Sequence, residues 1–126
     1  MQPLLPGIAD GEYSCVFVAG TLTHTVLKRP TGSEFRVQAS YGGRTTVVVP
    51  PANVRETAQR AVDALASGHV YARVDVVMDP VFGAVVMEVE MVEPDLFLRL
   101  AEDAAGLLAD AVLARVDASR RPTRAR

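Results

Sequence analysis

Residues 71–94 read YARVDVVMDPVFGAVVMEVEMVEP, which predicts two apolar β-strands joined by a short turn at the DPVFG segment. Side chains alternate between the two faces of a strand, so Arg73 and Asp75 share one face of the first strand. Glu88 and Glu90 share one face of the second strand by the same rule. In a tight hairpin the two faces coincide, which predicts three carboxylates and one guanidinium close together.

Three carboxylates at close range need a positive partner, because their repulsion and their desolvation both cost free energy. A hard divalent cation such as magnesium prefers carboxylate oxygens and often bridges to the phosphates of a substrate. One interpretation is therefore a magnesium site formed by Asp75, Glu88 and Glu90. The alternative is that these acids form the solvated face of a half-exposed hairpin, because alternation by itself is common.

The order of these residues resembles the metal-binding end of an ATP-grasp ligase. That family has arginine, one residue and aspartate, followed by a turn and a strand with glutamate, one residue, and asparagine or an acid. Arg73, Asp75, Glu88 and Glu90 follow this order, and the segment MEVEMVEPDLF is most similar to the cycloserine-forming cyclo-ligase and RimK-like branches. Peptide-forming ligases commonly have asparagine where this chain has Glu90.

The length and composition are those of one small domain with a real core, since 49% of the 126 residues are hydrophobic. The net charge of −2 argues against general affinity for nucleic acid. A single cysteine, Cys15, excludes an internal disulfide and predicts a reducing cytoplasm. We expect neither a signal peptide nor a membrane partner, because no apolar run has the required length or flanks.

Residues 1–10, MQPLLPGIAD, contain two prolines and a glycine, which predicts an extended lead-in and not a helix. The resemblance implies that this segment is the hinge strand of the ATP-grasp fold. Three residues would then lie beside the adenine: Gln2, Leu4 and Leu5. The acid that often holds the ribose in this family is not at its usual place, and either Asp10 or Glu12 is a candidate to replace it.

Apolar alternation predicts a hairpin of strands over 12–19 and 22–28 and two further short strands over 35–38 and 45–49. His24 lies inside the second strand without another histidine nearby. A surface or cross-strand role is therefore favoured for His24 over a role as a metal ligand.

Lys28 begins a basic loop, and the strand over 35–38 places Arg36 and Gln38 on one face. From the residues alone, Lys28 and Arg29 are an ordinary charged hairpin end. The resemblance implies that Lys28, Arg36 and Arg73 act on the phosphates or the acyl phosphate. It also implies a set of residues that line the substrate: Glu12, Ser14, Gln38, Gly42 and Gly43.

Two helices are predicted, over 53–67 and over roughly 100–116, from their apolar stripes. Asn53 can cap the first helix, and Gly68 can end it. Gly106 weakens the second helix by up to ~1 kcal/mol relative to alanine. The arginine-rich residues 118–126 are predicted to be a solvated, disordered tail.

These elements predict an α+β fold in which an antiparallel sheet packs against two helices. The resemblance implies that residues 1–117 are the C-terminal lobe of the ATP-grasp core, which binds ATP and Mg²⁺. The implied reaction joins a small carboxylate and an amine, or closes a ring, through an acyl phosphate. The family's preceding lobe has no counterpart here, so we expect the isolated chain to be inactive without a separate partner chain. The alternative is a non-catalytic remnant that serves as a protein-interaction module.

Overall fold

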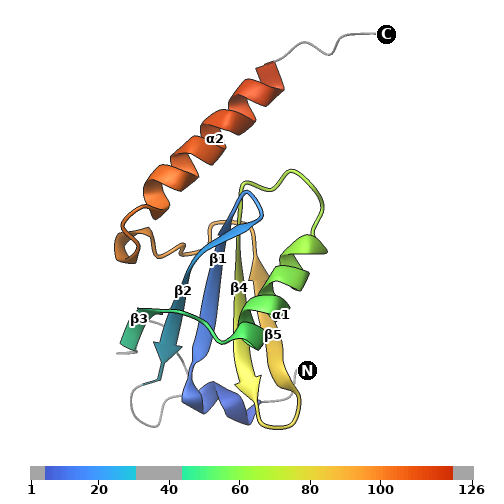
Figure 1. The fold of residues 1–126 in the computed structure, drawn as a ribbon, viewed down its shortest axis with the longest axis vertical. Coiled ribbons are helices and arrows are strands. Elements are labelled where there is room, and N and C mark those ends of the chain that lie inside the picture. Colours follow the sequence, from blue (N-terminus) through green and yellow to red (C-terminus); the bar gives the residue numbers. More distant parts are fainter. Residues whose placement is uncertain (1–4, 31–43, 121–126) are drawn as a thin grey trace.

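The computed structural model describes residues 5–30 and 44–120, which form a five-stranded antiparallel sheet of order β3-β2-β1-β4-β5 (Figure 1). The elements in chain order are η1 (Pro6–Asp10), β1 (Glu12–Val18), β2 (Thr21–Arg29), β3 (Arg44–Val48), α1 (Ala52–Asp63), β4 (Tyr71–Asp79), β5 (Gly83–Glu90), η3 (Leu98–Leu100) and α2 (Ala104–Arg120). The predicted α+β fold is confirmed.

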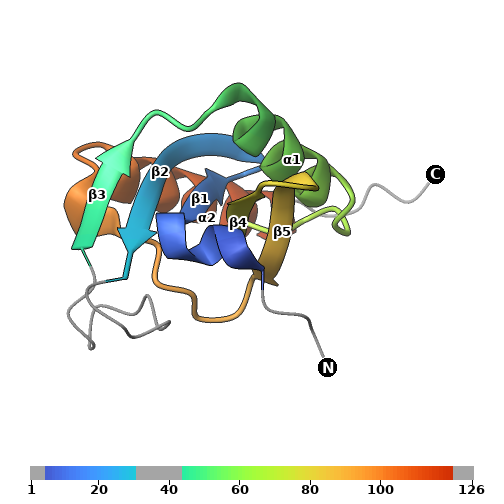
Figure 2. The ribbon, with the colours of Figure 1, turned by 90° about the horizontal axis from the view of Figure 1, so that it is seen from below.

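One face of the sheet is covered by α1, as Figures 1 and 2 show from two directions. The core on this side is made of small and branched side chains together with one large ring, that of Phe17. Val54, Ala58 and Val62 lie one helical turn apart, so they form a stripe that faces the strands. This apolar face buries one side of the sheet against α1, while the opposite face carries both polar side chains and a second, smaller apolar cluster.

The opposite face is partly covered by residues 91–97, which we call the strap and which run from β5 towards α2 (Figure 2). Leu96 and Phe97 at its end pack on Val16 and Val26 of the sheet. Glu93 and Phe97 both adopt a left-handed backbone, with φ of 52° and 50°. These conformations are costly for residues other than glycine, so the surrounding packing must hold them in place.

The prediction of an extended strand over residues 1–10 is wrong for the part that the structure describes, because Pro6–Asp10 form the 3-10 helix η1. Proline is tolerated at the first position of a helix, where no intrahelical bond needs its N–H. The backbone of η1 lies directly on β4. A Cβ added at Gly7 would lie 1.8 Å from the carbonyl oxygen of Met78.

The first predicted helix starts and ends earlier than expected. Pro51 occupies its N-cap position, whereas Asn53 lies inside the helix and its side-chain oxygen accepts from the amide of Val54. A proline supplies no side-chain acceptor, but its fixed φ suits the entry into a helix. The C-cap is Ala64, so Gly68 belongs to the loop before β4 and does not end the helix.

The second helix, α2, runs from Ala104 to Arg120, so residues 118–120, which were predicted to belong to a disordered tail, are helical. Alanine has a high helix propensity, which allows the helix to continue through Ala118. α2 projects away from the sheet in Figure 1, and only Ala104 among its residues is buried. Four of its large apolar side chains are exposed: Leu107, Val112, Leu113 and Val116.

Over the described part of the chain, no helix is both long enough and apolar enough to cross a membrane.

Replacing Gly106 with alanine is expected to raise the free energy of unfolding by roughly 0.5–1 kcal/mol, because alanine loses less backbone entropy in a helix. An added Cβ meets no atom within 4 Å there. Gly20 is the matched control, since its surroundings are equally open but its φ is 78°. Gly20→Ala should therefore destabilise by about 1–2 kcal/mol. Urea denaturation measures the free energy of unfolding, which should rise in Gly106→Ala and fall in Gly20→Ala.

Candidate functional site

Ionic side chains from four neighbouring strands gather on the face of the sheet that α1 does not cover. Strand register aligns Glu12 with Lys28, Asp75 with Ser14 and Glu88, and Arg73 with Glu90. We call this set the ionic cluster: Glu12, Ser14, Lys28, Arg73, Asp75, Glu88 and Glu90. The predicted meeting of Arg73 and Asp75 with both glutamates is therefore present.

A change of register between β4 and β5 brings the glutamates to this face. Val76 is aligned with Val86, but Asp75 is aligned with Glu88, so a β-bulge accommodates Met87. Because of this extra residue, Val86 packs towards α1 while Glu88 points to the opposite face of the sheet. The apolar and ionic sides of β5 are thus separated at this point.

Asp75 is the centre of the cluster and is only 2% exposed. Its Oδ1 accepts from the Ser14 hydroxyl at 2.7 Å and from Arg73 Nε at 3.0 Å. Its Oδ2 accepts from an Arg73 terminal nitrogen, Nη2, at 2.9 Å and lies 3.5 Å from Lys28 Nζ. Both oxygens of this buried carboxylate are therefore compensated, as burial of a charge requires.

Arg73 is held from three directions. Besides Asp75, it contacts Glu90 Oε2 at 2.7 Å through Nη2 and donates to the main-chain oxygen of Asp95 in the strap at 3.4 Å through Nη1. Burial opposes its positive charge, but the bonds and charges of Asp75 and of the two glutamates outweigh that effect and raise the pKa of Arg73. The guanidinium is thus charged and oriented.

The three acids predicted to bind a metal all direct an oxygen at one nitrogen, Arg73 Nη2. The distances are 2.9 Å from Asp75, 2.7 Å from Glu90 and 3.9 Å from Glu88. Within residues 5–30 and 44–120, no three carboxylate, histidine or cysteine side chains are themselves grouped as a metal site. The guanidinium lies among these acids, and it supplies the positive charge that their convergence requires.

The charge of the whole ionic cluster nevertheless fits a hard divalent cation. The cluster has four carboxylates, those of Glu12, Asp75, Glu88 and Glu90, and only two cationic side chains, those of Lys28 and Arg73. Two negative charges are left in excess, which is the charge that one Mg²⁺ would balance. Glu88 and Glu90 are also the more exposed acids of the cluster, so a cation from solvent can reach them.

Lys28 forms a cross-strand ion pair with Glu12 in addition to its contact with Asp75. Both side chains are only 13% exposed. The lysine is therefore held among acids and is not free in solvent, as an ordinary hairpin end would be.

His24 is a structural residue that fastens the strap to the sheet. Its Nε2 lies 2.9 Å from the carbonyl oxygen of Leu96, and its Nδ1 lies 2.9 Å from the Thr23 hydroxyl. Burial lowers the pKa of His24, so the ring is neutral at pH 7 and donates from Nε2. His24 was predicted to be a surface or cross-strand residue. It is instead buried, and its ring bonds to the adjacent Thr23 and to the strap.

Several predicted site residues lie outside the described part of the chain: Gln2, Leu4, Arg36, Gln38, Gly42 and Gly43. Leu5 is half-buried and immediately precedes η1. Ser14 is fully buried, and its hydroxyl points at Asp75, which separates it from a direct contact with a ligand.

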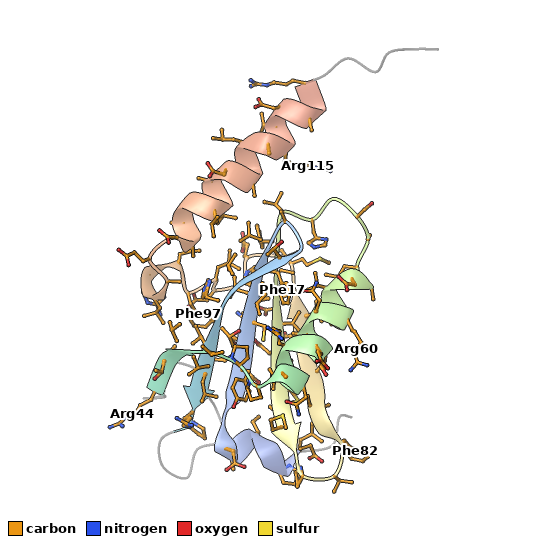
Figure 3. The ribbon with its side chains drawn as sticks, in the orientation of Figure 1. Phe17, Arg44, Arg60, Phe82, Phe97 and Arg115 are labelled. Atoms are coloured by element: carbon orange, nitrogen blue, oxygen red, sulfur yellow. The ribbon has the colours of Figure 1, made fainter. Side chains whose placement is uncertain are left out.

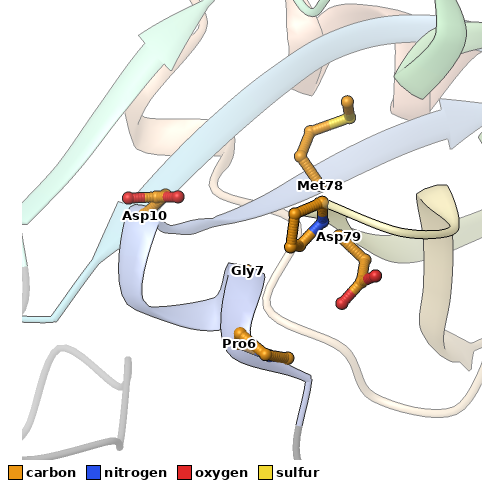
Figure 4. Close-up of a pocket in the computed structure, with 6 residues that line it drawn as sticks. Pro6, Gly7, Asp10, Met78 and Asp79 are labelled. Atoms are coloured by element: carbon orange, nitrogen blue, oxygen red, sulfur yellow. The ribbon is translucent and has the colours of Figure 1, made fainter.

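A separate open hollow lies between η1 and the end of β4 (Figure 4). Its lining is Pro6, Gly7, Asp10, Met78, Asp79 and Pro80. Asp79 uses Oδ1 to accept from the turn amides of Val81 and Phe82, so this carboxylate stabilises the β4–β5 turn. None of the residues of the ionic cluster lines this hollow.

Replacing Glu88 with glutamine is expected to stabilise the protein at pH 7 and to have little effect near pH 4. Burial raises the pKa of Glu88, and Glu90 and Asp75 raise it further against the opposing effect of Arg73. An acid whose pKa is higher in the folded state loses stability as pH rises above its unfolded value of about 4.3, because the unfolded chain deprotonates first. Thermal unfolding at the two pH values measures the difference, and an equal change at both would contradict this assignment.

No protein-family model matches the sequence, and a search of curated proteins finds no match. Solved structures do share its fold. D-cycloserine synthetase DcsG matches 91% of this chain with a TM-score of 0.75 and 25% identity. The D-alanine–D-alanine ligase from Bacillus anthracis complexed with ATP matches 87%, with a TM-score of 0.59 and 24% identity.

A third solved structure is the ATP-grasp ligase PsnB complexed with a phosphomimetic variant of its minimal precursor, Mg and ADP. It matches 90% of this chain, with a TM-score of 0.61 and 17% identity. The present chain spans 41%, 39% and 34% of the three neighbouring chains, which is about two-fifths of their length. The predicted resemblance to part of an ATP-grasp ligase is confirmed.

Proposed function

We propose that this chain is the ATP- and Mg²⁺-binding lobe of an ATP-grasp ligase that joins a carboxylate to an amine or closes a ring. The observation that carries the proposal is the convergence of three carboxylates on Arg73 Nη2, on the open face of a sheet with the fold of these ligases. Two of the similar structures are complexes with ATP or with Mg and ADP.

Mg²⁺ would be held by Glu88, Glu90 and Asp75, and it would neutralise charge on the phosphates when bound. For Glu90 to serve as a ligand, its bond to Arg73 must open. That opening frees a guanidinium donor, which can then contact the transferring phosphoryl group in a fixed geometry. Lys28 and Arg36 are proposed to assist Arg73 as further cations.

The proposed reaction has two steps. A carboxylate oxygen of the substrate attacks the γ-phosphorus of ATP, the bond to the bridging oxygen breaks, and ADP leaves with that electron pair. The nitrogen of the amine then attacks the carbonyl carbon of the acyl phosphate, the amide bond forms, and phosphate departs while the nitrogen loses a proton. The proposed role of Arg73 is to stabilise the negative charge that develops on oxygen in both steps.

The remaining assignments rest on the resemblance stated from the sequence. Residues proposed beside the adenine are Gln2, Leu4 and Leu5. Residues proposed on the substrate side are Glu12, Gln38, Gly42 and Gly43. Ser14 was predicted with them, but it is fully buried behind Asp75, so we propose no direct substrate contact for it. Because the chain spans about two-fifths of similar ligases, we further propose that a separate chain supplies the remaining lobe and that the isolated chain is inactive.

Isothermal titration of Mg-ATP into the chain, alone and with a candidate partner chain, tests the proposal. We expect weak binding alone and tighter binding with the partner, and Asp75→Asn should abolish the magnesium-dependent heat. Glu56→Gln is a matched control, because Glu56 is an exposed acid on α1, across the sheet from the cluster. Tight binding by the isolated chain would contradict the need for a partner, and an unchanged signal in Asp75→Asn would contradict the metal assignment.

The second candidate function is a non-catalytic interaction module, and the exposed apolar side chains of α2 favour it. A helix that is apolar on most sides is normally buried against another element. Size-exclusion chromatography with light scattering distinguishes the two functions. A clean monomer at high concentration that still binds Mg-ATP would exclude self-association and favour the ligase lobe.

A further inference from the structure

Ser14 is a buried hydroxyl at the base of the ionic cluster. It is 0% exposed and lies on β1 between Val26 of β2 and Asp75 of β4. Its hydroxyl donates to Asp75 Oδ1 at 2.7 Å. Since Ser14 has no path to solvent, it can influence a ligand only through the carboxylate that it touches.

The bonds of Asp75 show what Ser14 contributes. A carboxylate has about four lone-pair positions, and four donor atoms from three side chains approach Asp75: Ser14 Oγ, Arg73 Nε and Nη2, and Lys28 Nζ. Arginine and lysine are long side chains with several rotatable bonds, whereas the serine oxygen is one torsion from the β1 backbone. Ser14 therefore supplies the short fixed contact, and the two cations arrange themselves around the carboxylate that it holds.

We propose that Ser14 is a positioning residue that fixes the Asp75 carboxylate and, through it, the direction in which Arg73 presents Nη2 to Glu90. The effect of Ser14 on a bound cation or phosphate rests on the proposed function. The effect of Ser14 on the orientation of Arg73 is independent of that function, because Arg73 bonds to Asp75 and Glu90 without any ligand. An experiment can therefore contradict one of these effects and leave the other standing.

Three variants of the full chain test this role. Ser14→Ala removes the donor without adding volume, and Ser14→Thr keeps the hydroxyl and should restore the behaviour of the native residue. Thr25→Val is the matched control, because Thr25 is also a buried hydroxyl of the same hairpin, but it donates to Cys15 Sγ on the face that α1 covers. Thermal unfolding of each variant measures the general cost of losing a buried hydroxyl.

The decisive measurement is exchange of the Arg73 Nε–H with water, followed by ¹⁵N NMR. Ser14→Ala should speed this exchange by about tenfold, the change expected when a charge-assisted hydrogen bond is lost, while Thr25→Val should leave it unchanged. An unchanged rate in Ser14→Ala, or an equal change in Thr25→Val, would overturn the assignment. Failure of Ser14→Thr to restore the rate in a folded variant would overturn it as well.

Titration with Mn²⁺, followed by electron paramagnetic resonance, measures whether Ser14 affects metal binding at the ionic cluster. Ser14→Ala should weaken Mn²⁺ binding by roughly 10- to 100-fold, as for other groups that orient a ligand from behind. If no variant, including the native chain, binds Mn²⁺, the proposed function fails, and the Arg73 exchange rate still decides the role of Ser14. If Mn²⁺ binds equally well to native chain and Ser14→Ala, the ligase proposal survives and the positioning role is overturned.

Discussion

Replacing Asp75 with alanine is expected to lower the free energy of unfolding by about 3–5 kcal/mol, the cost of removing one partner from a buried ion pair. Arg73 would keep its charge in a largely buried position and lose two of its hydrogen bonds. Ser14 would lose the acceptor of its hydroxyl in a site without solvent. Such a loss is a large fraction of the stability of a small domain.

Urea denaturation at pH 7 measures this effect. Asp75→Asn should cost less than Asp75→Ala, because the amide oxygen can still accept from Ser14. Glu88→Ala is the control, since the Glu88 side chain is 56% exposed and meets Arg73 only at 3.9 Å. If Asp75→Ala lowers the free energy of unfolding by less than about 1 kcal/mol, Asp75 behaves like an ordinary surface charge. That result would contradict its role as a buried partner of Arg73.

The second large effect is expected for Phe97→Ala, which should also cost about 3–5 kcal/mol, as for other large-to-small changes in a core. The side chain of Phe97, at the end of the strap, is buried against Val16 and Val26 of the sheet. Alanine keeps a Cβ, so the left-handed backbone at this position stays strained while the packing that holds it is lost. The strap should then detach from the sheet, releasing the bonds that Arg73 and His24 make to its carbonyl groups.

Phe82 provides the control for this change, because it is the same residue type in the β4–β5 turn and is 74% exposed (Figure 3). Phe82→Ala should leave the unfolding midpoint nearly unchanged. Hydrogen exchange of residues 91–100 in Phe97→Ala reports whether the strap opens. Full protection there, together with a small stability loss, would show that the strap does not depend on the ring of Phe97.

Four of the seven residues of the ionic cluster could be predicted to meet from the sequence, because a strand has a fixed period of two. Arg73, Asp75, Glu88 and Glu90 were placed on one face by alternation, and their order gave the resemblance that the solved structures support. The bulge at Met87 did not disturb this prediction, because both glutamates follow it in the chain. Alternation did not indicate that Ser14 lies beneath Asp75, which depends on how β1 and β4 pair.

Other features were not predictable from local patterns. Phe97 adopts φ of 50° because of packing with distant strands, and no local residue preference signals this. Pro6 and Gly7 indicated a break in regular structure, yet the contact of η1 with β4 selects a 3-10 turn. The boundaries of α1 and α2 moved by several residues because helix ends are set by caps and packing as much as by composition.

The bulge at Met87 gives β5 one residue more than β4 without changing the face that the glutamates occupy. Deleting Met87 would leave Val86 opposite Val76 and Glu88 opposite Asp75, so a regular strand would keep the same cross-strand pairs. One residue inserted between Glu88 and Glu90 would instead turn one of them towards the apolar layer under α1. Chains with this architecture should therefore tolerate a one-residue difference in length at Met87 more readily than between the two glutamates.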